Sequence, residues 1–253
     1  MDLGLRDKRA IITGATKGIG RQILELLVAE GCHVATCSRS PEDVEQTIEK
    51  CTTRKAKVHG KACDIGIPEE YSAFIDDMVA ELDGVDIFIP NVSAGGGMDS
   101  EKNWWKNFEV DVLGTVRGCE AVIPHMIEGG GGAITMISTT AALETFAGPQ
   151  AYNAMKASLL TYAKQLSQFH GHEKIRVNSV SPGPIEFPGG SWDMIKDTIP
   201  KFYDKTIRDH PTRRLGKPQE VARCVVFLSS AAASWVSGAN LVVDGGFTKR
   251  VQF

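Results

Sequence analysis

The stretch Thr13-Gly14-Ala15-Thr16-Lys17-Gly18-Ile19-Gly20 decides the fold of this chain. It joins a short apolar run to a longer run, residues 19–29, whose apolar residues recur at helical spacing. Gly14 allows a tight turn, Gly18 lets the backbone approach a pyrophosphate, and Gly20 permits close packing of helix on strand. The amino terminus of the helix then offers unpaired N–H groups and a positive dipole end to phosphate. The stretch therefore predicts a strand–turn–helix unit that binds phosphates.

The same alternation of short apolar runs and longer amphipathic runs continues along the chain. Strands are expected at residues 10–13, 33–37, 57–63, 86–89, 133–138, 175–180 and 240–243. Helices are expected over residues 19–29, from residue 40 onward, and over 68–82, 104–127, 152–169 and 218–228, with a loop-rich stretch before the last. Strands that alternate with helices of this length predict βαβ units and a parallel sheet. We expect one doubly wound α/β domain over residues 1–253, with ligands at the carboxyl ends of the strands.

Composition excludes several classes of protein. The chain has 253 residues, of which 42% are hydrophobic and 23% charged, as in ordinary globular proteins. Its 28 basic and 31 acidic residues give a net charge of -3, which argues against nucleic acid or an anionic membrane as the main partner. No window approaches the ~18 apolar residues of a membrane span, and the amino terminus lacks the apolar run of a signal peptide. The six cysteines form no CxxC pair, so zinc-ligand spacing is missing, and we expect a cytoplasmic protein with reduced thiols.

Further motifs follow the glycine turn in a recognisable order. They are Cys63-Asp64-Ile65, Asn91, Tyr152-Asn153-Ala154-Met155-Lys156, and residues 178–183 and 237–246. On these motifs, which run from end to end, the chain resembles the short-chain dehydrogenase/reductase family, in particular 3-oxoacyl reductases and related ketone reductases of the single-domain type. The resemblance implies a Rossmann fold with a parallel sheet of about seven strands and helices on both faces. It also implies a homotetramer that acts on a small-molecule carbonyl or alcohol substrate.

The residues after the second strand bear on the choice of cofactor. An NAD enzyme needs an acid there to accept from the adenine-ribose 2′-OH, but Ser38 and Arg39 stand at this place. The planar guanidinium of Arg39 can pair with a 2′-phosphate, and Lys17 adds a second cation. Both cations could instead be solvated surface charges. We expect NADP(H) as the cofactor.

The resemblance extends the cofactor site along the chain. It implies that Asp64 and Ile65 touch adenine, that Asn91 lies near the inner ribose, and that the Ile185 N–H donates to the nicotinamide carboxamide. The residues expected to bind the cofactor are Gly14, Thr16, Lys17, Gly18, Ile19, Gly20, Ser38, Arg39, Asp64, Ile65, Asn91, Tyr152, Lys156, Pro182, Gly183 and Ile185.

Tyr152 and Lys156 are the candidates for proton transfer. They are four residues apart on an expected helix and therefore share one face. A free tyrosine has a pKa of ~10, and a nearby ammonium together with a cationic nicotinamide would lower it. Tyr152 would then be the general acid in reduction and the general base in oxidation. Lys156 would also hold the nicotinamide ribose.

Two further catalytic positions depend on the resemblance. The family has a serine 13 positions before its tyrosine, a count that leads to Thr139, whereas a one-residue shift would present Ser138 instead. The family also has an asparagine at the position of Asp111. The Asp111 carboxylate would either stand as a negative charge near Lys156 or face solvent at a helix bend.

The substrate is expected to bind under a lid formed by residues of about 186–215. Phe146, Phe187 and Trp192 are candidates for an apolar wall, although each could be plain core. His210 is expected to line the lid or to lie on the surface. The alternative to an enzyme is a dinucleotide-binding paralogue that senses or scaffolds without turnover, which Asp111 and Thr139 motivate.

Overall fold

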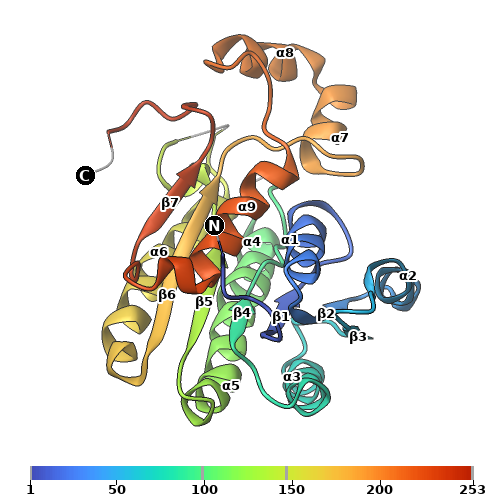
Figure 1. The fold of residues 1–253 in the computed structure, drawn as a ribbon. Coiled ribbons are helices and arrows are strands. Elements are labelled where there is room, and N and C mark those ends of the chain that lie inside the picture. Colours follow the sequence, from blue (N-terminus) through green and yellow to red (C-terminus); the bar gives the residue numbers. More distant parts are fainter. Residues whose placement is uncertain (1, 98–99, 146–147, 252–253) are drawn as a thin grey trace.

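The strand that precedes the glycine turn lies inside a seven-stranded sheet (Figure 1). The computed structural model describes residues 2–97, 100–145 and 148–251. Its strands are β1 (Arg9–Thr13), β2 (His33–Ser38), β3 (Val58–Ala62), β4 (Ile87–Ile89), β5 (Gly132–Ile137), β6 (Ile175–Pro182) and β7 (Asn240–Val243). All neighbouring strands pair in parallel, in the order β3-β2-β1-β4-β5-β6-β7. The expected doubly wound α/β architecture, a Rossmann fold, is confirmed.

The strand order reverses between β1 and β4. From β1 the chain builds outward through β2 and β3, and from β4 it builds in the opposite direction through β5, β6 and β7. The register places Thr13 beside Cys37 of β2 and Ile12 beside Ile89 of β4. In sheets of this kind, ligands bind outside the carboxyl ends of the strands at the reversal. The glycine turn after Thr13 lies at this point.

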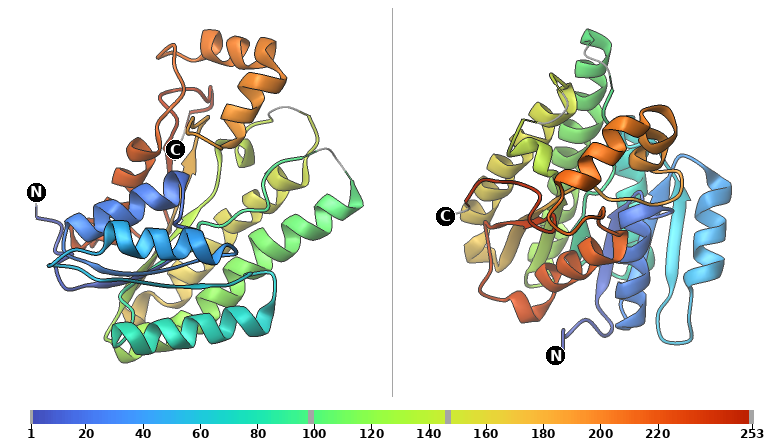
Figure 2. Two further views of the ribbon diagram at one scale, coloured as in Figure 1. Left: turned by 90° about the vertical axis from the view of Figure 1, so that its right-hand side faces the viewer. Right: turned by 90° about the horizontal axis from the view of Figure 1, so that it is seen from above.

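Helices cover both faces of the sheet (Figure 2). They are α1 (Gly18–Ala29), α2 (Pro41–Cys51), α3 (Pro68–Leu82), α4 (Glu101–Asn107), α5 (Gly114–Glu128), α6 (Ala151–Phe169), α7 (Ser191–Thr198), α8 (Pro200–Asp209) and α9 (Pro218–Ser229). Short 3-10 turns occur at η2 (Thr140–Ala142), η3 (Gly171–Glu173) and η4 (Ala231–Ala233).

Two hydrophobic clusters correspond to the two faces. One joins the buried sides of α1, α2 and α9 to the sheet, for example through Leu24 and Val225. The other joins α3, α5 and α6, for example through Phe74, Val122 and Leu159. Burial of both faces explains why the strands read as continuous apolar runs instead of alternating ones.

The stretch expected to be helical over residues 104–127 is helical throughout, but it is not one regular α-helix. The structure divides this region into α4, a π-helix η1 (Phe108–Leu113) and α5. A π-helix adds one residue to a helical turn and is found mostly at functional sites. Asp111 lies within it and is fully buried.

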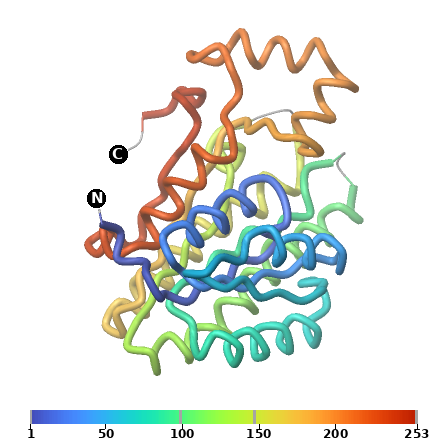
Figure 3. Tube along the Cα trace, turned by 45° about the vertical axis from the view of Figure 1, so that its right-hand side comes forward, coloured from blue at the N-terminus to red at the C-terminus, as the bar shows by residue number. Residues whose placement is uncertain are grey.

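The loop-rich stretch expected before the last helix contains two helices, α7 and α8. They rise above the carboxyl ends of the strands, and the tube view shows the C-terminal segment at the same end of the molecule (Figure 3). Pro200 opens α8, as proline does in a first helical turn, and the packing of Trp192 on Phe202 joins the two helices. None of the described helices has the length and apolar character that crossing a bilayer requires.

Candidate active site

The glycine turn has the geometry that its sequence predicts. Gly14 and Gly18 adopt positive φ angles of +70° and +57°, which favour glycine. A Cβ atom on Gly20 would lie 2.5 Å from the Asn91 amide nitrogen and 2.5 Å from the Gly14 carbonyl oxygen. The close packing of α1 on the strands that the sequence analysis expected at Gly20 is therefore confirmed.

The first turn of α1 is capped by no side chain, although the Phe187 ring lies against Gly18. Lys17 occupies the N-cap position, where its side chain makes no capping hydrogen bond, and the turn contains no acidic residue. Unpaired N–H groups at a helix amino terminus bind phosphate well. The turn, with its glycines, therefore fits the pyrophosphate of a dinucleotide.

Asn91 ties the glycine turn to the neighbouring strand. Its side-chain amide donates to the carbonyl oxygens of Thr13 and Gly14, both at 3.1 Å, and its backbone N–H donates to the Thr13 hydroxyl at 3.0 Å. The amide therefore fixes the turn. The ribose contact that the resemblance implies stays a prediction.

The residues expected to hold the adenosine end lie at the carboxyl ends of β2 and β3. Ser38 ends β2, Arg39 follows it and is exposed, and Ile65 is buried in the second hydrophobic cluster. The Asp64 carboxylate accepts from the Gly66 N–H at 3.0 Å. Within the described ranges, neither Arg39 nor Lys17 forms an ion pair, so both charges are available to a phosphate.

At the nicotinamide end, β6 leads directly into the expected contacts. Pro182 ends the strand, and the Gly183 N–H donates to the Val243 carbonyl oxygen at 3.0 Å. Ile185 is buried and forms a parallel bridge with Gly216. The three residues expected to meet the nicotinamide thus lie on one segment at the edge of the sheet.

Lys156 forms a buried ion pair with Asp111. Its ammonium lies 3.0 Å from Asp111 Oδ1 and donates to the Ile137 carbonyl oxygen at 3.0 Å. The side chain of Lys156 is 3% exposed and that of Asp111 0%. The alternative in which Asp111 faces solvent is therefore wrong.

The remaining polar atoms of Asp111 are also engaged. Its Oδ2 accepts from the Ala94 N–H at 3.1 Å, and its backbone carbonyl oxygen accepts from the Thr115 hydroxyl at 2.8 Å. The π-helix thus aims the carboxylate at Lys156 while the next turn holds the backbone. A buried carboxylate of this kind is retained in a fold only when it is paired.

The pKa of Tyr152 is raised, in contrast to the expected lowering. Burial raises it most, and the negative charge of Asp111 adds to the rise. The Lys156 ammonium and a hydrogen bond with the Thr139 side chain act in the opposite direction. The direction differs from the expectation because desolvation of the phenolate outweighs the nearby ammonium.

The two hydroxyl candidates point to different partners. The Thr139 side chain hydrogen-bonds Tyr152 and accepts from the Ala141 N–H at 3.2 Å. Ser138 is buried, and its hydroxyl donates to the Lys156 carbonyl oxygen at 3.0 Å. The structure thus brings Thr139, and not Ser138, to the phenol of Tyr152.

The three candidates for the substrate wall have different surroundings. Phe187 packs its ring against Gly18 and lines a cavity of about 570 Å³ between α1, α8 and residues 213–219. Trp192 stacks on Phe202 of α8, with ring centroids 5.9 Å apart, and so belongs to the lid's own packing. Phe146 lies outside the described residues. Contact with substrate stays a prediction for all three.

The sequence left the place of His210 open and did not identify Glu144. His210 is 3% exposed, so the expectation that it might lie on the surface is wrong. Glu144 accepts hydrogen bonds from the C-terminal segment and carries no motif that would have identified it. The one available signal was the Gly245-Gly246 pair after β7, which is typical of a turn.

Comparisons with known proteins agree with this geometry. A family model described as enoyl-(acyl carrier protein) reductase matches residues 14–248. The isoepoxydon dehydrogenase of Penicillium expansum is 32% identical over 256 residues, which cover 99% of this chain and 98% of that protein.

Solved structures match over nearly the whole chain as well. L-sorbose reductase from Gluconobacter frateurii, complexed with NADPH and L-sorbose, has a TM-score of 0.92 and 28% identity, covering 99% of this chain and 100% of that one. A 7α-hydroxysteroid dehydrogenase complexed with NADH and 7-oxoglycochenodeoxycholic acid has a TM-score of 0.90 and 30% identity, covering 99% and 98%.

Proposed function

Because the chain belongs to the short-chain dehydrogenase/reductase family, we propose that it is an NADP(H)-dependent oxidoreductase that interconverts a small-molecule carbonyl compound and a secondary alcohol. The observation that carries the proposal is the buried ion pair of Lys156 with Asp111, at 3.0 Å, one helical turn from Tyr152, whose phenol interacts with the Thr139 side chain. A phenol and a hydroxyl that meet in this way can both hydrogen-bond one carbonyl oxygen. The proposed enzyme is a single domain over residues 1–253 with a lid at about 186–215.

In the proposed mechanism, Tyr152 moves the proton. During reduction its phenol donates to the carbonyl oxygen, and during oxidation the phenolate accepts from the alcohol. The Thr139 hydroxyl donates to the same oxygen and orients it. NADP(H), when bound, supplies or accepts the hydride at the carbonyl carbon. The phenol of Tyr152 is protonated at neutral pH even at the ordinary tyrosine pKa of ~10, and burial raises that pKa further, so the phenol can serve as the acid in reduction.

Lys156 and Asp111 influence the proton transfer through their charges, without donating to the substrate. The ammonium stabilises the phenolate and can hold a ribose hydroxyl, while Asp111 holds the ammonium from the opposite side. Ser138 fixes the backbone of α6 at Lys156 and so positions the lysine. We assign Tyr152, Thr139 and Lys156 to the reacting groups and Asp111 and Ser138 to their positioning.

The choice of NADP(H) rests on this chain's own residues. Arg39 after β2 and Lys17 in the glycine turn supply two cations for a 2′-phosphate, and no acid stands where a 2′-OH would be accepted. The L-sorbose reductase structure contains NADPH, which favours this choice, whereas the 7α-hydroxysteroid dehydrogenase structure contains NADH. Relatives alone therefore do not decide the cofactor.

We propose a homotetramer in the cytoplasm as the working form. The exposed side of α6 presents the small side chains Ala154, Ser158 and Thr161, which suit close packing of helix on helix. Sedimentation of the purified protein tests the assembly: a monomer would contradict it.

A screen of cofactors and substrates tests the activity. The purified protein is mixed with NADPH or NADH and with cyclic, aryl and β-keto carbonyl compounds, and consumption of the reduced cofactor is followed. We expect carbonyl-dependent oxidation that is faster with NADPH. Tight NADPH binding without turnover of any compound would favour the sensor or scaffold instead.

A further inference from the structure

After β7 the chain continues beyond the carboxyl end of the sheet (Figure 1). Residues 244–250 form a segment, here called the C-terminal strap, whose first turn is fixed by Asp244. One oxygen of this carboxylate accepts from the Thr248 N–H at 2.8 Å and the Thr248 hydroxyl at 2.7 Å, and the other accepts from the Gly246 N–H at 2.9 Å. The strap therefore has a defined path.

One side of the strap packs on the base of the lid. The Phe247 ring stacks on His210, which follows α8, with centroids 5.4 Å apart and an interplanar angle of 22°. Gly245 has a φ of +61°, and a Cβ there would lie 2.8 Å from the His210 ring. This approach requires glycine, and it explains why His210 is buried.

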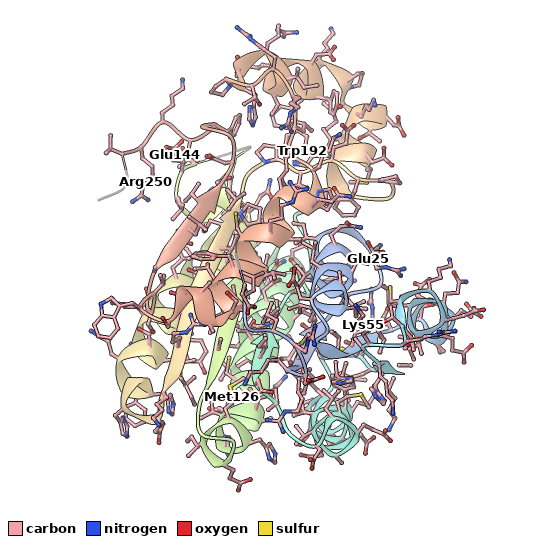
Figure 4. The ribbon with its side chains drawn as sticks, in the orientation of Figure 1. Glu25, Lys55, Met126, Glu144, Trp192 and Arg250 are labelled. Atoms are coloured by element: carbon pink, nitrogen blue, oxygen red, sulfur yellow. The ribbon has the colours of Figure 1, made fainter. Side chains whose placement is uncertain are left out.

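The other side of the strap is held by Glu144. The Oε1 atom of Glu144 accepts from the backbone N–H groups of Lys249 at 2.8 Å and Arg250 at 2.7 Å. The guanidinium of Arg250 donates to the Leu143 carbonyl oxygen at 3.4 Å. The side chains of Glu144 and Arg250 lie next to each other at the strap's end (Figure 4). Hydrogen bonds to a charged acceptor are the strong kind.

The strap thus joins two segments that flank the candidate active site. Glu144 lies five residues after Thr139, and His210 closes the lid. The strap begins beside Gly183, because a Cβ on Gly183 would lie 2.7 Å from that of Asp244. Gly183 belongs to the segment that should meet the nicotinamide, so the strap starts at this end of the site and continues past the lid base to Glu144.

We propose that Glu144 is a positioning residue that sets the size of carbonyl substrate the enzyme accepts, by latching the C-terminal strap across the substrate entrance. The proposal rests on the carbonyl reductase function above. With the latch closed, the strap, the lid base and the Thr139 loop form one wall that admits compact substrates. Release of the latch widens the entrance and favours bulky ones.

The test compares Glu144→Ala with Glu144→Gln. The alanine removes the acceptor, whereas the glutamine keeps an oxygen that can accept both N–H groups and loses only the charge. Steady-state kinetics are measured with a compact cyclic ketone and its aryl-substituted analogue. For Glu144→Ala we expect kcat/KM for the bulky ketone, divided by kcat/KM for the compact ketone, to rise about tenfold. The change should come mainly from KM, because the hydrogen bonds that the alanine removes fix the wall and not the reacting groups. Glu144→Gln should stay within about twofold of wild type, as should Glu49→Ala, which removes an exposed glutamate on α2.

Amide hydrogen exchange of Lys249 and Arg250 is measured in the same proteins, because it needs no substrate. Protection should fall in Glu144→Ala and persist in Glu144→Gln. Unchanged protection in the alanine variant overturns the latch, and lost protection with an unchanged substrate ratio overturns its role in specificity. If wild type reduces no carbonyl compound, both the proposed function and the proposed role in specificity are wrong. The exchange data would still show whether Glu144 holds the strap, because they need no substrate.

Discussion

At the scale of single residues, the buried carboxylate of Asp111 distinguishes the candidate active site. A carboxylate that is fully buried and 3.0 Å from the Lys156 ammonium makes ionisation of Tyr152 harder. Asp111→Asn removes this charge and should therefore lower the pKa of Tyr152. As pH increases, the oxidative rate should then rise, and the reductive rate should fall, at a lower pH than in wild type. The kcat at neutral pH should stay within about tenfold of wild type. The measurement is the pH–rate profile in both directions.

A matched control for this profile is Thr115→Val. It removes the hydroxyl that donates to the Asp111 backbone carbonyl but keeps the carboxylate. Its profile should coincide with that of wild type. If Asp111→Asn also leaves the profile in place, the carboxylate does not influence Tyr152.

Thr139 and Ser138 are neighbours with separable effects. Thr139→Ala removes the hydroxyl that meets Tyr152, so kcat should fall by roughly 10²-fold with little change in stability. Ser138→Ala breaks a buried hydrogen bond to the Lys156 backbone and should cost about 1 kcal/mol of unfolding free energy, with the smaller loss of kcat. Kinetics and chemical denaturation of the two variants, run side by side, check both parts. A larger kcat loss for Ser138→Ala would reverse the assignment.

The groups proposed for this site came from the sequence, but their environments did not. The spacing of Tyr152 and Lys156 places them on one helix face, and the family resemblance supplied the count that leads to Thr139. The direction of the Tyr152 pKa did not follow, because desolvation depends on α6, β5 and the π-helix packing together. The same holds for the orientation of Ser138, which turns toward the α6 backbone.

At the scale of elements, the end of β2 should control cofactor choice. Arg39 is exposed directly after this strand, where an acid would accept from a ribose hydroxyl. Arg39→Asp replaces a cation for the 2′-phosphate with such an acceptor, so NADPH affinity should fall roughly 10- to 100-fold. Titration of both cofactors against the variant and wild type checks this. Arg54→Asp, an exposed arginine beyond α2, is the control, and a wild type that prefers NADH would contradict the cofactor assignment.

The strands were more predictable than the helices. Parallel strands that are buried on both faces are mainly apolar, so most of the seven stood out as runs, whereas β3 carries a histidine and a lysine and is largely outside the core. The π-helix did not, because its extra residue leaves the apolar pattern of 104–127 nearly unchanged. The lid helices α7 and α8 were missed because they bury little: no residue of α7 is buried, and in α8 only Tyr203 and Thr206 are.

At the scale of the whole molecule, His210 couples folding to pH. Burial lowers its pKa in the folded chain, while Asp244 acts in the opposite direction. The unfolded chain therefore binds more protons as pH falls below about 6.5, the ordinary value for histidine. Stability from this group is complete above that pH and is lost as pH falls toward the folded-state pKa.

His210→Gln should consequently weaken the pH dependence of the melting temperature. Thermal unfolding of wild type and variant is measured at about pH 7.5 and about pH 5.5, and the drop in Tm between the two pH values is compared. The drop in Tm should be smaller in the variant. His33→Gln, which replaces a half-buried histidine at the start of β2, serves as the control. Equal drops in wild type and His210→Gln would show that this residue does not titrate with folding.

The path of the C-terminal strap could not be inferred from the sequence. A glycine pair indicated a turn after β7, but the segment reaches Glu144 across more than a hundred positions of sequence. Such contacts follow from the tertiary fold, since the carboxyl ends of β5, β6 and β7 bring the segments to one edge of the sheet.

The account as a whole claims that Tyr152 passes the proton in an NADPH-dependent reduction of a carbonyl compound. The most direct measurement is NADPH oxidation by wild type and Tyr152→Phe with the best substrate of the screen, alongside NADPH binding to each. Tyr162→Phe, another tyrosine of α6, is the matched control. We expect turnover of Tyr152→Phe to fall at least about 100-fold with NADPH affinity unchanged, and Tyr162→Phe to remain active. A Tyr152→Phe variant that keeps most of its kcat would contradict the account.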